Sequence, residues 1–314
     1  MSKMLAVVGP TASGKSDLAV ELCKRYCGEV VSCDSMQIYK KMNIGTAKPS
    51  KKDMKDVTHH LIDFLEPGTA YSVSEYVSDA AKCVDDIWSR GHIPVFCGGT
   101  GLYIDSFISG ISYSDFENDP KVRERIENEC ECFGIDGIYE RLMKVDPEIA
   151  KSIDIHNTKR VIRALEVYET TGVTMTEWNR RSVENARKKD CLILGLDYEN
   201  RELLYERIDK RVDIMLERGL LEETKLLIDE GLLSGKTASQ AIAYKELLPY
   251  FSGDDSLENC VEILKRNSRR YAKRQLTWFR RNKNIKWIYR DGKPFECVIS
   301  DACELVDKYL SEEN

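Results

Sequence analysis

The sequence has no long hydrophobic run, few prolines, and no cysteine spacing typical of a metal site. No stretch of roughly 18 apolar residues occurs in the chain, so we expect no membrane-spanning helix. The first residues lead straight into an apolar strand, without a signal-type hydrophobic region and cleavage site. Cys23 and Cys27 form a close pair, as do Cys130 and Cys132, but neither has a second pair at zinc-ligand spacing. These absences, with 11 scattered cysteines, predict a reduced, cytoplasmic protein.

The charge balance limits the partners that the whole surface could attract. The formal net charge is -6, which argues against non-specific nucleic-acid binding driven by bulk charge. A hydrophobic content of 42% and a charged content of 32% are ordinary for a globular protein. With 314 residues, the chain can form one large domain or two smaller ones. A negative total is nevertheless compatible with a local basic surface.

Residues 4–16, "MLAVVGPTASGKS", have the pattern of a P-loop between a strand and a helix. The glycines allow backbone N–H groups to turn around an anionic oxygen, and the helix N-terminus favours negative charge. Lys15 would supply a point charge to the phosphates, and the Ser16 hydroxyl would ligate Mg²⁺. The predicted phosphate-binding residues are Gly9, Pro10, Thr11, Ala12, Ser13, Gly14, Lys15 and Ser16.

A P-loop predicts a polyphosphate or pyrophosphate with Mg²⁺, but not which bond breaks. A small-molecule kinase, an NTPase and a transferase with a diphosphate leaving group all fit this motif. The strand-like residues 93–96 are followed by "CGGTGLYIDS", with no immediate Walker B aspartate, and Asp63 is a weak substitute. No guanine-specificity motif or kinase catalytic loop is present, which makes a standard NTPase less suitable.

A carboxylate follows the second apolar strand, in "EVVSCDSMQIYKK". Asp34 could be a strand-end cap or turn residue, or a functional group at the phosphate site. Thr100, in "GGTGLY", could similarly be a hydroxyl that caps the following helix. The residues alone leave both alternatives open.

The middle of the chain differs from its two ends. Residues 113–188 are charged and poor in strand signals, and they contain three amphipathic helical patterns. A strand-like run returns at 191–197. We therefore predict an α/β core with a parallel sheet from residues 1–112 and 189–314, interrupted by a helical insertion at 113–188.

The C-terminal part contains a basic segment within an acidic protein. Residues 265–290 include eleven Lys and Arg residues but no Asp or Glu. On a helix, Arg266, Arg270, Lys273, Thr277 and Arg281 form one stripe. Leu257, Val261, Leu264, Tyr271 and Trp278 form an apolar face. A cationic stripe backed by a core-facing side suits contacts to an RNA backbone.

The motifs together resemble one family. "GPTASGKS", "SCDSMQIYKKMNIGTAKP", "HHLID", "YSVSEYVSDA", "IPVFCGGTGLY", "NTKRVIRALEVYETTG" and "AKRQLTWFRR" occur in the order found in bacterial tRNA dimethylallyltransferases, also called tRNA isopentenyltransferases. The resemblance covers roughly residues 4–290. It implies a P-loop α/β fold and transfer of a dimethylallyl group from its diphosphate to N6 of the adenosine 3′ of the anticodon. The implied tRNAs read codons that begin with U.

The resemblance also implies roles for individual residues. Asp34 matches the catalytic general base, while Lys15 and Mg²⁺ on Ser16 would stabilise the leaving diphosphate. Thr100 matches a position in the reaction channel, and Arg207 or Arg211 would reach the diphosphate. The implied contacts to the tRNA anticodon stem-loop are Asp34, Ser35, Met36, Gln37, Thr100, Arg123, Lys159, Arg160, Val161, Ile162, Arg163, Lys273, Arg274, Gln275, Thr277, Trp278 and Arg280.

Some residues depart from the family pattern. Ala243 stands where glycine is common, and Gln240 stands where some members have arginine, and these departures weaken the implied tRNA contact at 240–245. An isopentenyltransferase that uses a free adenine nucleotide is a close alternative. The helical insertion and "KRQLTWFR" argue against it. An RNA-binding protein with an inactive P-loop is a non-enzymatic alternative. The family further implies a monomer that does not bind membranes.

Overall fold

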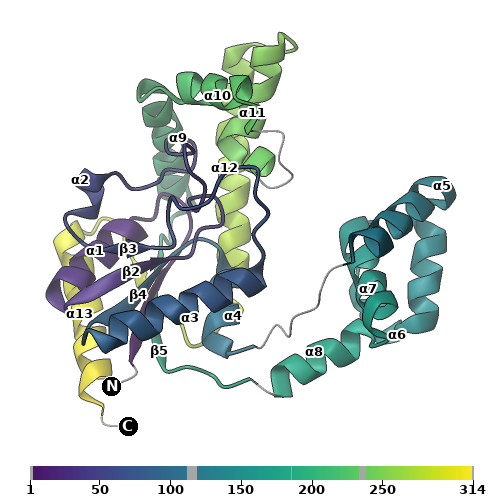
Figure 1. Ribbon diagram of the computed structural model, residues 1–314. Coiled ribbons are helices and arrows are strands. Elements are labelled where there is room, and N and C mark those ends of the chain that lie inside the picture. The colour runs from purple at the N-terminus through teal and green to yellow at the C-terminus, as the bar shows by residue number, and fades with distance from the viewer. Residues whose placement is uncertain (1–2, 112–118, 185, 233–237, 313–314) are drawn as a thin grey trace. The chain divides into compact units, whose positions relative to one another are not determined.

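The computed structural model (Figure 1) describes residues 3–111, 119–184, 186–232 and 238–312. Two compact units are present, one formed by Met1–Ile108 with Asp190–Asn314 and the other by Ser109–Lys189. We call them unit 1 and unit 2. The boundary predicted at residue 113 lies outside the described residues. The boundary predicted at residue 189 is one residue before the return to unit 1 at Asp190.

Unit 1 contains a six-stranded parallel sheet in the order β3-β2-β4-β1-β5-β6. Its strands are β1 (Met4–Val8), β2 (Gly28–Ser32), β3 (His59–His60), β4 (Ile93–Gly98), β5 (Cys191–Asp197) and β6 (Lys286–Tyr289). The central strand β1 pairs with β4 on one side and β5 on the other, with Val8 opposite both Gly98 and Gly195. The predicted α/β class is thus confirmed.

Helices cover both faces of the sheet. Successive residues of β1 point to opposite faces, so all of them are buried. Met4, Ala6 and Val8 pack with α3 (Val73–Ser89) and α4 (Gly101–Ser109). Leu5 and Val7 pack with α1 (Lys15–Arg25) and α13 (Phe295–Ser311). Such continuous apolar strands are typical of parallel sheets that are buried on both sides.

A helical group completes unit 1 and supports the chain that follows β2. It contains α9 (Arg201–Glu217), α10 (Leu220–Asp229), a 3₁₀ turn (Ala238–Gln240), α11 (Ile242–Ser252) and α12 (Leu257–Phe279), and the short α2 (Lys51–Met54) precedes β3. Glu223 on α10 accepts backbone N–H bonds from Asn43, Ile44 and Gly45, and also the hydroxyl bond of Tyr244 at 2.7 Å. One carboxylate therefore fixes the loop that follows Asp34.

Unit 2 has its own apolar core. It contains α5 (Pro120–Val145), α6 (Pro147–Ser152), α7 (Thr158–Thr171) and α8 (Met175–Glu184). Helix α5 is kinked at Gly134, whose φ of 78° is unfavourable for residues with a Cβ. Ile126, Ile138 and Leu142 of α5 pack against Val161 and Leu165 of α7. Among the described helices of both units, none has the length and hydrophobicity needed to cross a membrane.

Candidate active site

The P-loop, Asp34 and Thr100 follow three neighbouring parallel strands. Gly9 comes directly after β1, Asp34 comes two residues after β2, and Thr100 comes two residues after β4, which lies between them. The carboxyl ends of these strands share one edge of the sheet, where α/β proteins bind ligands. We call this the catalytic edge.

The P-loop glycines occupy positions that exclude larger residues. A Cβ on Gly9, whose φ is 151°, would lie 2.5 Å from the carbonyl oxygen of Leu196. Gly14 has a φ of 88°, and a Cβ there would lie 2.2 Å from Nη1 of Arg290. Ser13 N–H donates to the Pro10 carbonyl at 3.3 Å, which closes the turn between them. The loop therefore has the tight backbone that the sequence pattern predicts.

Gln275 of α12 connects the P-loop to the turn after β4. Its Oε1 accepts the N–H of Thr11 at 2.9 Å, and its Nε2 donates to the Gly99 carbonyl at 3.0 Å. The side chain is 5% exposed. The sequence assigned Gln275 to tRNA contact, whereas the structure uses both ends of its amide to join two catalytic loops. This connection spans 264 residues of sequence.

Lys15 and Arg211 bring two cations to the interior of the catalytic edge. Lys15 Nζ donates to the Pro10 carbonyl at 3.2 Å. Burial lowers the pKa of Lys15 and Arg211 lowers it further, while Cys97 and Asp34 act in the opposite direction. Burial also lowers the pKa of Arg211, against the effect of Asp34 and Asp17. A cation removed from water in this way gains by binding an anion.

Asp34 forms a turn that presents its carboxylate beside Ser35 and Thr100. Its Oδ1 accepts the N–H of Met36 at 2.9 Å and that of Gln37 at 3.3 Å. The Thr100 hydroxyl oxygen accepts the N–H of Ser35 at 3.0 Å. One carboxylate oxygen is thus used locally, and among the described residues no hydrogen bond to Oδ2 accompanies those to Oδ1. Gln37 Nε2 donates to the carbonyls of Thr46 and Ala47, each at 3.1 Å, which orders the loop behind Asp34.

Two further arginines hold the outside of the P-loop. Arg207 Nε donates to the Ala12 carbonyl at 3.1 Å, and Arg290 Nη1 donates to the Ser13 carbonyl at 2.6 Å. Of the two arginines proposed for the diphosphate, Arg207 therefore contacts the P-loop backbone. Arg211 lies in the electric field of Lys15 and Asp34.

The predicted RNA side of α12 divides into exposed and buried parts. Arg266, Arg270, Lys273, Arg274 and Thr277 are exposed. Trp278 is half-buried, and its Nε1 donates to Asp105 of α4 at 2.6 Å. Arg280 is exposed but forms an ion pair with buried Asp197 at 3.1 Å. Arg281 lies beyond the end of α12 at Phe279, so the predicted helical stripe is one member shorter.

The candidate tRNA residues of unit 2 also differ in accessibility. Lys159 and Arg160 are exposed in the first turn of α7, whereas Val161 and Ile162 are buried in the core of the unit. Arg163 pairs with Glu166 at 3.0 Å, as does Arg123 at 3.4 Å. Lys159 and Arg160 lie at the positive end of the helix dipole, and the first turn of α7 contains no acidic residue, so a bound phosphate would be favourable there.

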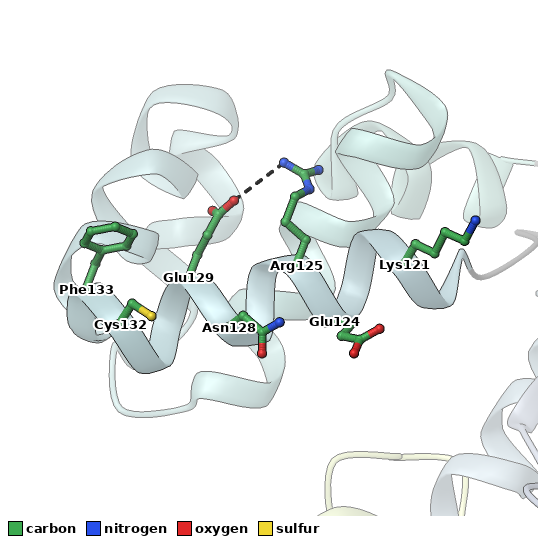
Figure 2. Close-up of a pocket in the computed structure, with 7 residues that line it drawn as sticks. All are labelled: Lys121, Glu124, Arg125, Asn128, Glu129, Cys132 and Phe133. Carbon is green, nitrogen blue, oxygen red and sulfur yellow. Dashed lines mark ion pairs between the residues drawn. The ribbon is translucent and has the colours of Figure 1, made fainter.

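A separate hollow lies on α5, within unit 2. Figure 2 shows its lining, which includes Lys121, Arg125, Glu129, Cys132 and the exposed ring of Phe133. Arg125 is paired with Glu129 at 3.6 Å and also contacts Glu169. The hollow contains none of the P-loop residues, and two of its charged residues, Arg125 and Glu129, are already paired.

Sequence reasoning missed two contributors to the catalytic edge. Arg290 was counted only within a basic segment, and Tyr271, whose pKa is raised by burial and by Asp34, was assigned only to the apolar face of α12. Neither residue has a local motif, because each reaches the site through the fold. The basic composition of 265–290 was the only available signal for Arg290.

Known proteins resemble this chain over nearly its whole length. The family model described as IPP transferase matches residues 37–282, and that described as isopentenyl transferase matches residues 2–68. A tRNA dimethylallyltransferase of Caldanaerobacter subterraneus subsp. tengcongensis is 46% identical over 290 residues, 92% of each chain. One from Oceanobacillus iheyensis is 43% identical and covers 97% of this chain and 98% of its own length.

Solved structures give the same result. A full-length tRNA isopentenylpyrophosphate transferase from Bacillus halodurans has a TM-score of 0.74 and 39% identity, covering 99% of this chain and 97% of its own. A eukaryotic dimethylallyltransferase acting on tRNA has a TM-score of 0.84 and 30% identity, covering 98% of this chain and 80% of its own. With the P-loop and Asp34 at the same edge of the sheet, on strands separated only by β4, these similarities show that the chain belongs to the IPP transferase family.

Proposed function

We propose that this protein transfers a dimethylallyl group from dimethylallyl diphosphate to N6 of the adenosine 3′ of the anticodon in tRNAs that read codons beginning with U. The observation that carries the proposal is the placement of Asp34 and Thr100 beside the P-loop on adjoining strand ends. This arrangement brings a base next to a diphosphate site. The near full-length similarity to tRNA dimethylallyltransferases supports the same reaction.

The reaction is a displacement at an allylic carbon. The N6 nitrogen forms a bond to C1 of the dimethylallyl group, and the C1–O bond breaks with its electron pair leaving on the diphosphate. The nitrogen becomes acidic as it gains positive character, and Asp34 takes its proton. The P-loop amides, Lys15 and Arg211 hold the diphosphate and stabilise the charge that it gains. No phosphoryl group is transferred.

Mg²⁺ fits this site through Ser16. Ser16 is exposed at the start of α1, directly after Lys15. In the described parts of the chain, His, Cys, Asp and Glu residues form no group of three or more suited to a metal. A Mg²⁺ ion that keeps several waters and binds diphosphate oxygens needs only one or two protein ligands. Bound there, Mg²⁺ would neutralise diphosphate charge.

The tRNA would use the exposed cations. Arg266, Arg270, Lys273 and Arg274 on α12 can contact phosphates, since this helix reaches the catalytic edge through Gln275. Lys159 and Arg160 on unit 2 offer a second set. The target base must leave the stacked anticodon loop to reach Asp34.

The test supplies purified protein with radiolabelled dimethylallyl diphosphate, Mg²⁺ and unmodified tRNA, with AMP and ATP in parallel reactions. We expect label in tRNA, no label in AMP, and no transfer by Asp34→Ala. Label in AMP alone would assign the protein to the free-nucleotide class. ATP consumption without prenyl transfer would support a kinase instead.

A further inference from the structure

Arg290 lies against the P-loop from the far end of the chain. It directly follows β6, and its backbone N–H donates to the Asp197 carbonyl at 3.0 Å. Its Nη1 donates to the Ser13 carbonyl at 2.6 Å. A Cβ on Gly14 would lie 2.2 Å from the same nitrogen, so the guanidinium packs directly on the Gly14 backbone.

We propose that Arg290 is a positioning residue of the diphosphate site. In a trans peptide the C=O and the N–H point in opposite directions. By holding the Ser13 carbonyl outward, Arg290 turns the Gly14 N–H toward the interior of the P-loop, where it can donate to the diphosphate. The inference rests on the proposed function for the identity of the anion.

The orientation of the Arg290 side chain is set by aromatic rings. Its guanidinium lies 5.0 Å from the ring centroid of Phe295 and 5.9 Å from that of Tyr198. Arg207 lies 5.8 Å from the same Tyr198 ring. Cation–π contacts thus gather two guanidinium groups at neighbouring carbonyls of one loop. Their mutual repulsion is relieved when an anion binds between or beside them.

Unsatisfied polar atoms also occur here. Among the described residues, four buried side-chain nitrogen and oxygen atoms have no hydrogen-bond partner, and they include Ser13 Oγ and Arg290 Nε. Buried polar groups are normally paired, so two such atoms at one loop indicate a site that is completed by a ligand. Burial lowers the pKa of Arg290 and Arg207 adds to this, whereas Tyr198 and Asp17 act in the opposite direction.

The test measures binding of inorganic pyrophosphate with Mg²⁺ by calorimetry, together with steady-state kinetics. Arg290→Gln is expected to weaken pyrophosphate binding about tenfold, because a charged hydrogen bond and a cation are lost. Arg290→Lys keeps the charge without the planar guanidinium, and its affinity for pyrophosphate should lie between those of wild type and Arg290→Gln. The Michaelis constant for dimethylallyl diphosphate should rise in parallel, while that for tRNA stays unchanged. Lys293→Gln is the matched control, since Lys293 is paired with Asp301 at 2.9 Å and should bind as wild type.

Binding and transfer distinguish failure of this inference from failure of the proposed function. If Arg290→Gln binds pyrophosphate within about twofold of wild type, the inference is wrong. A change in the Michaelis constant for tRNA alone also overturns it. Should Arg290→Gln fail to fold, unchanged binding by folded Arg290→Lys would likewise reject the role of the guanidinium fork. Weaker pyrophosphate binding in an enzyme that transfers nothing to tRNA supports Arg290 and rejects the proposed function.

Discussion

The two ends of the sheet in unit 1 differ in how completely their charged side chains are paired. At the amino end, the Glu29 carboxylate of β2 accepts bonds from His60 Nε2 at 2.7 Å and His92 Nδ1 at 2.5 Å, and both terminal nitrogens of Arg90 contact it. Its side chain is 5% exposed. Three side chains of the protein thus supply four nitrogens to the two oxygens of this carboxylate.

At the catalytic edge, cations outnumber the carboxylates around them. Lys15, Arg207, Arg211 and Arg290 surround one loop, and the carboxylates that influence them are those of Asp17 and Asp34. Within the described parts of the chain, Arg290 Nε and Ser13 Oγ have no hydrogen-bond partner. A cluster whose charges are all paired within the protein stabilises the fold. A cluster with more cations than protein carboxylates favours binding of an anionic ligand.

The largest expected effect is at Asp34. Asp34→Asn should lower kcat about a thousandfold, because the amide cannot accept the N6 proton. Pyrophosphate binding and the unfolding midpoint should stay near wild-type values, since the amide oxygen can still accept the N–H groups of Met36 and Gln37. Single-turnover transfer assays and thermal melting measure the two quantities. Normal transfer by Asp34→Asn would show that Asp34 is only a turn residue.

The opposite pattern is expected at Glu29. Glu29→Gln should destabilise the fold by about 3 kcal/mol, because Arg90, His60 and His92 lose their buried partner. Activity per folded molecule should remain. Denaturant unfolding and active-site titration measure these effects. Asp86→Asn is the matched control, since Asp86 also pairs with Arg90 but is 60% exposed.

The pH dependence at Glu29 follows from its lowered pKa. Burial raises the pKa of Glu29, but hydrogen bonds from Arg90, His60 and His92 outweigh it and bring the pKa to about 2. The folded pKa lies below the unfolded value of about 4.3, so the contribution is present above that value and is lost as the pH falls toward 2. The stability difference between wild type and Glu29→Gln should therefore shrink from pH 5 to pH 2.5. A difference that grows on acidification would contradict this.

The sequence predicted those parts of the fold that local patterns determine. The apolar runs at residues 4–8 and 191–197 became β1 and β5, because continuous hydrophobic segments bounded by polar residues suit a buried parallel sheet. The P-loop was predicted because its glycines are required locally. Strand β6 was missed, since its four residues begin with a lysine inside a basic segment.

Contacts between distant segments could not be read in the same way. Gln275 was assigned to tRNA by resemblance, and nothing in its neighbourhood indicates that its amide meets Thr11 and Gly99. The burial of Val161 and Ile162 follows from the 3.6-residue period of α7, which separates them from exposed Lys159 and Arg160. A motif copied residue by residue takes no account of that period.

A smaller effect is expected at Gln275. Gln275→Met keeps the length of the side chain but removes both hydrogen bonds that join the P-loop to Gly99. The Michaelis constant for dimethylallyl diphosphate should rise about fivefold, since the net value of such bonds is about 1 kcal/mol. Asn259→Ala is the control, because Asn259 is exposed and its side chain donates to Asp255, which precedes α12. A change in tRNA affinity alone would instead support a direct RNA contact by Gln275.

The smallest effect extends the same distinction to unit 2. Arg180 forms ion pairs with Glu177 and Glu184, while no ion pair involves Lys159 or Arg160 in the described residues. If cations without an ion pair bind phosphates, Lys159→Gln should reduce the salt dependence of tRNA binding by about one counterion. Arg180→Gln should leave it unchanged. Filter binding at several salt concentrations measures the slope. Equal slopes for wild type and Lys159→Gln would show that an unpaired charge at a helix N-terminus is not sufficient to contact RNA. The link between unpaired cations and ligand binding would then hold only for the cluster at the catalytic edge.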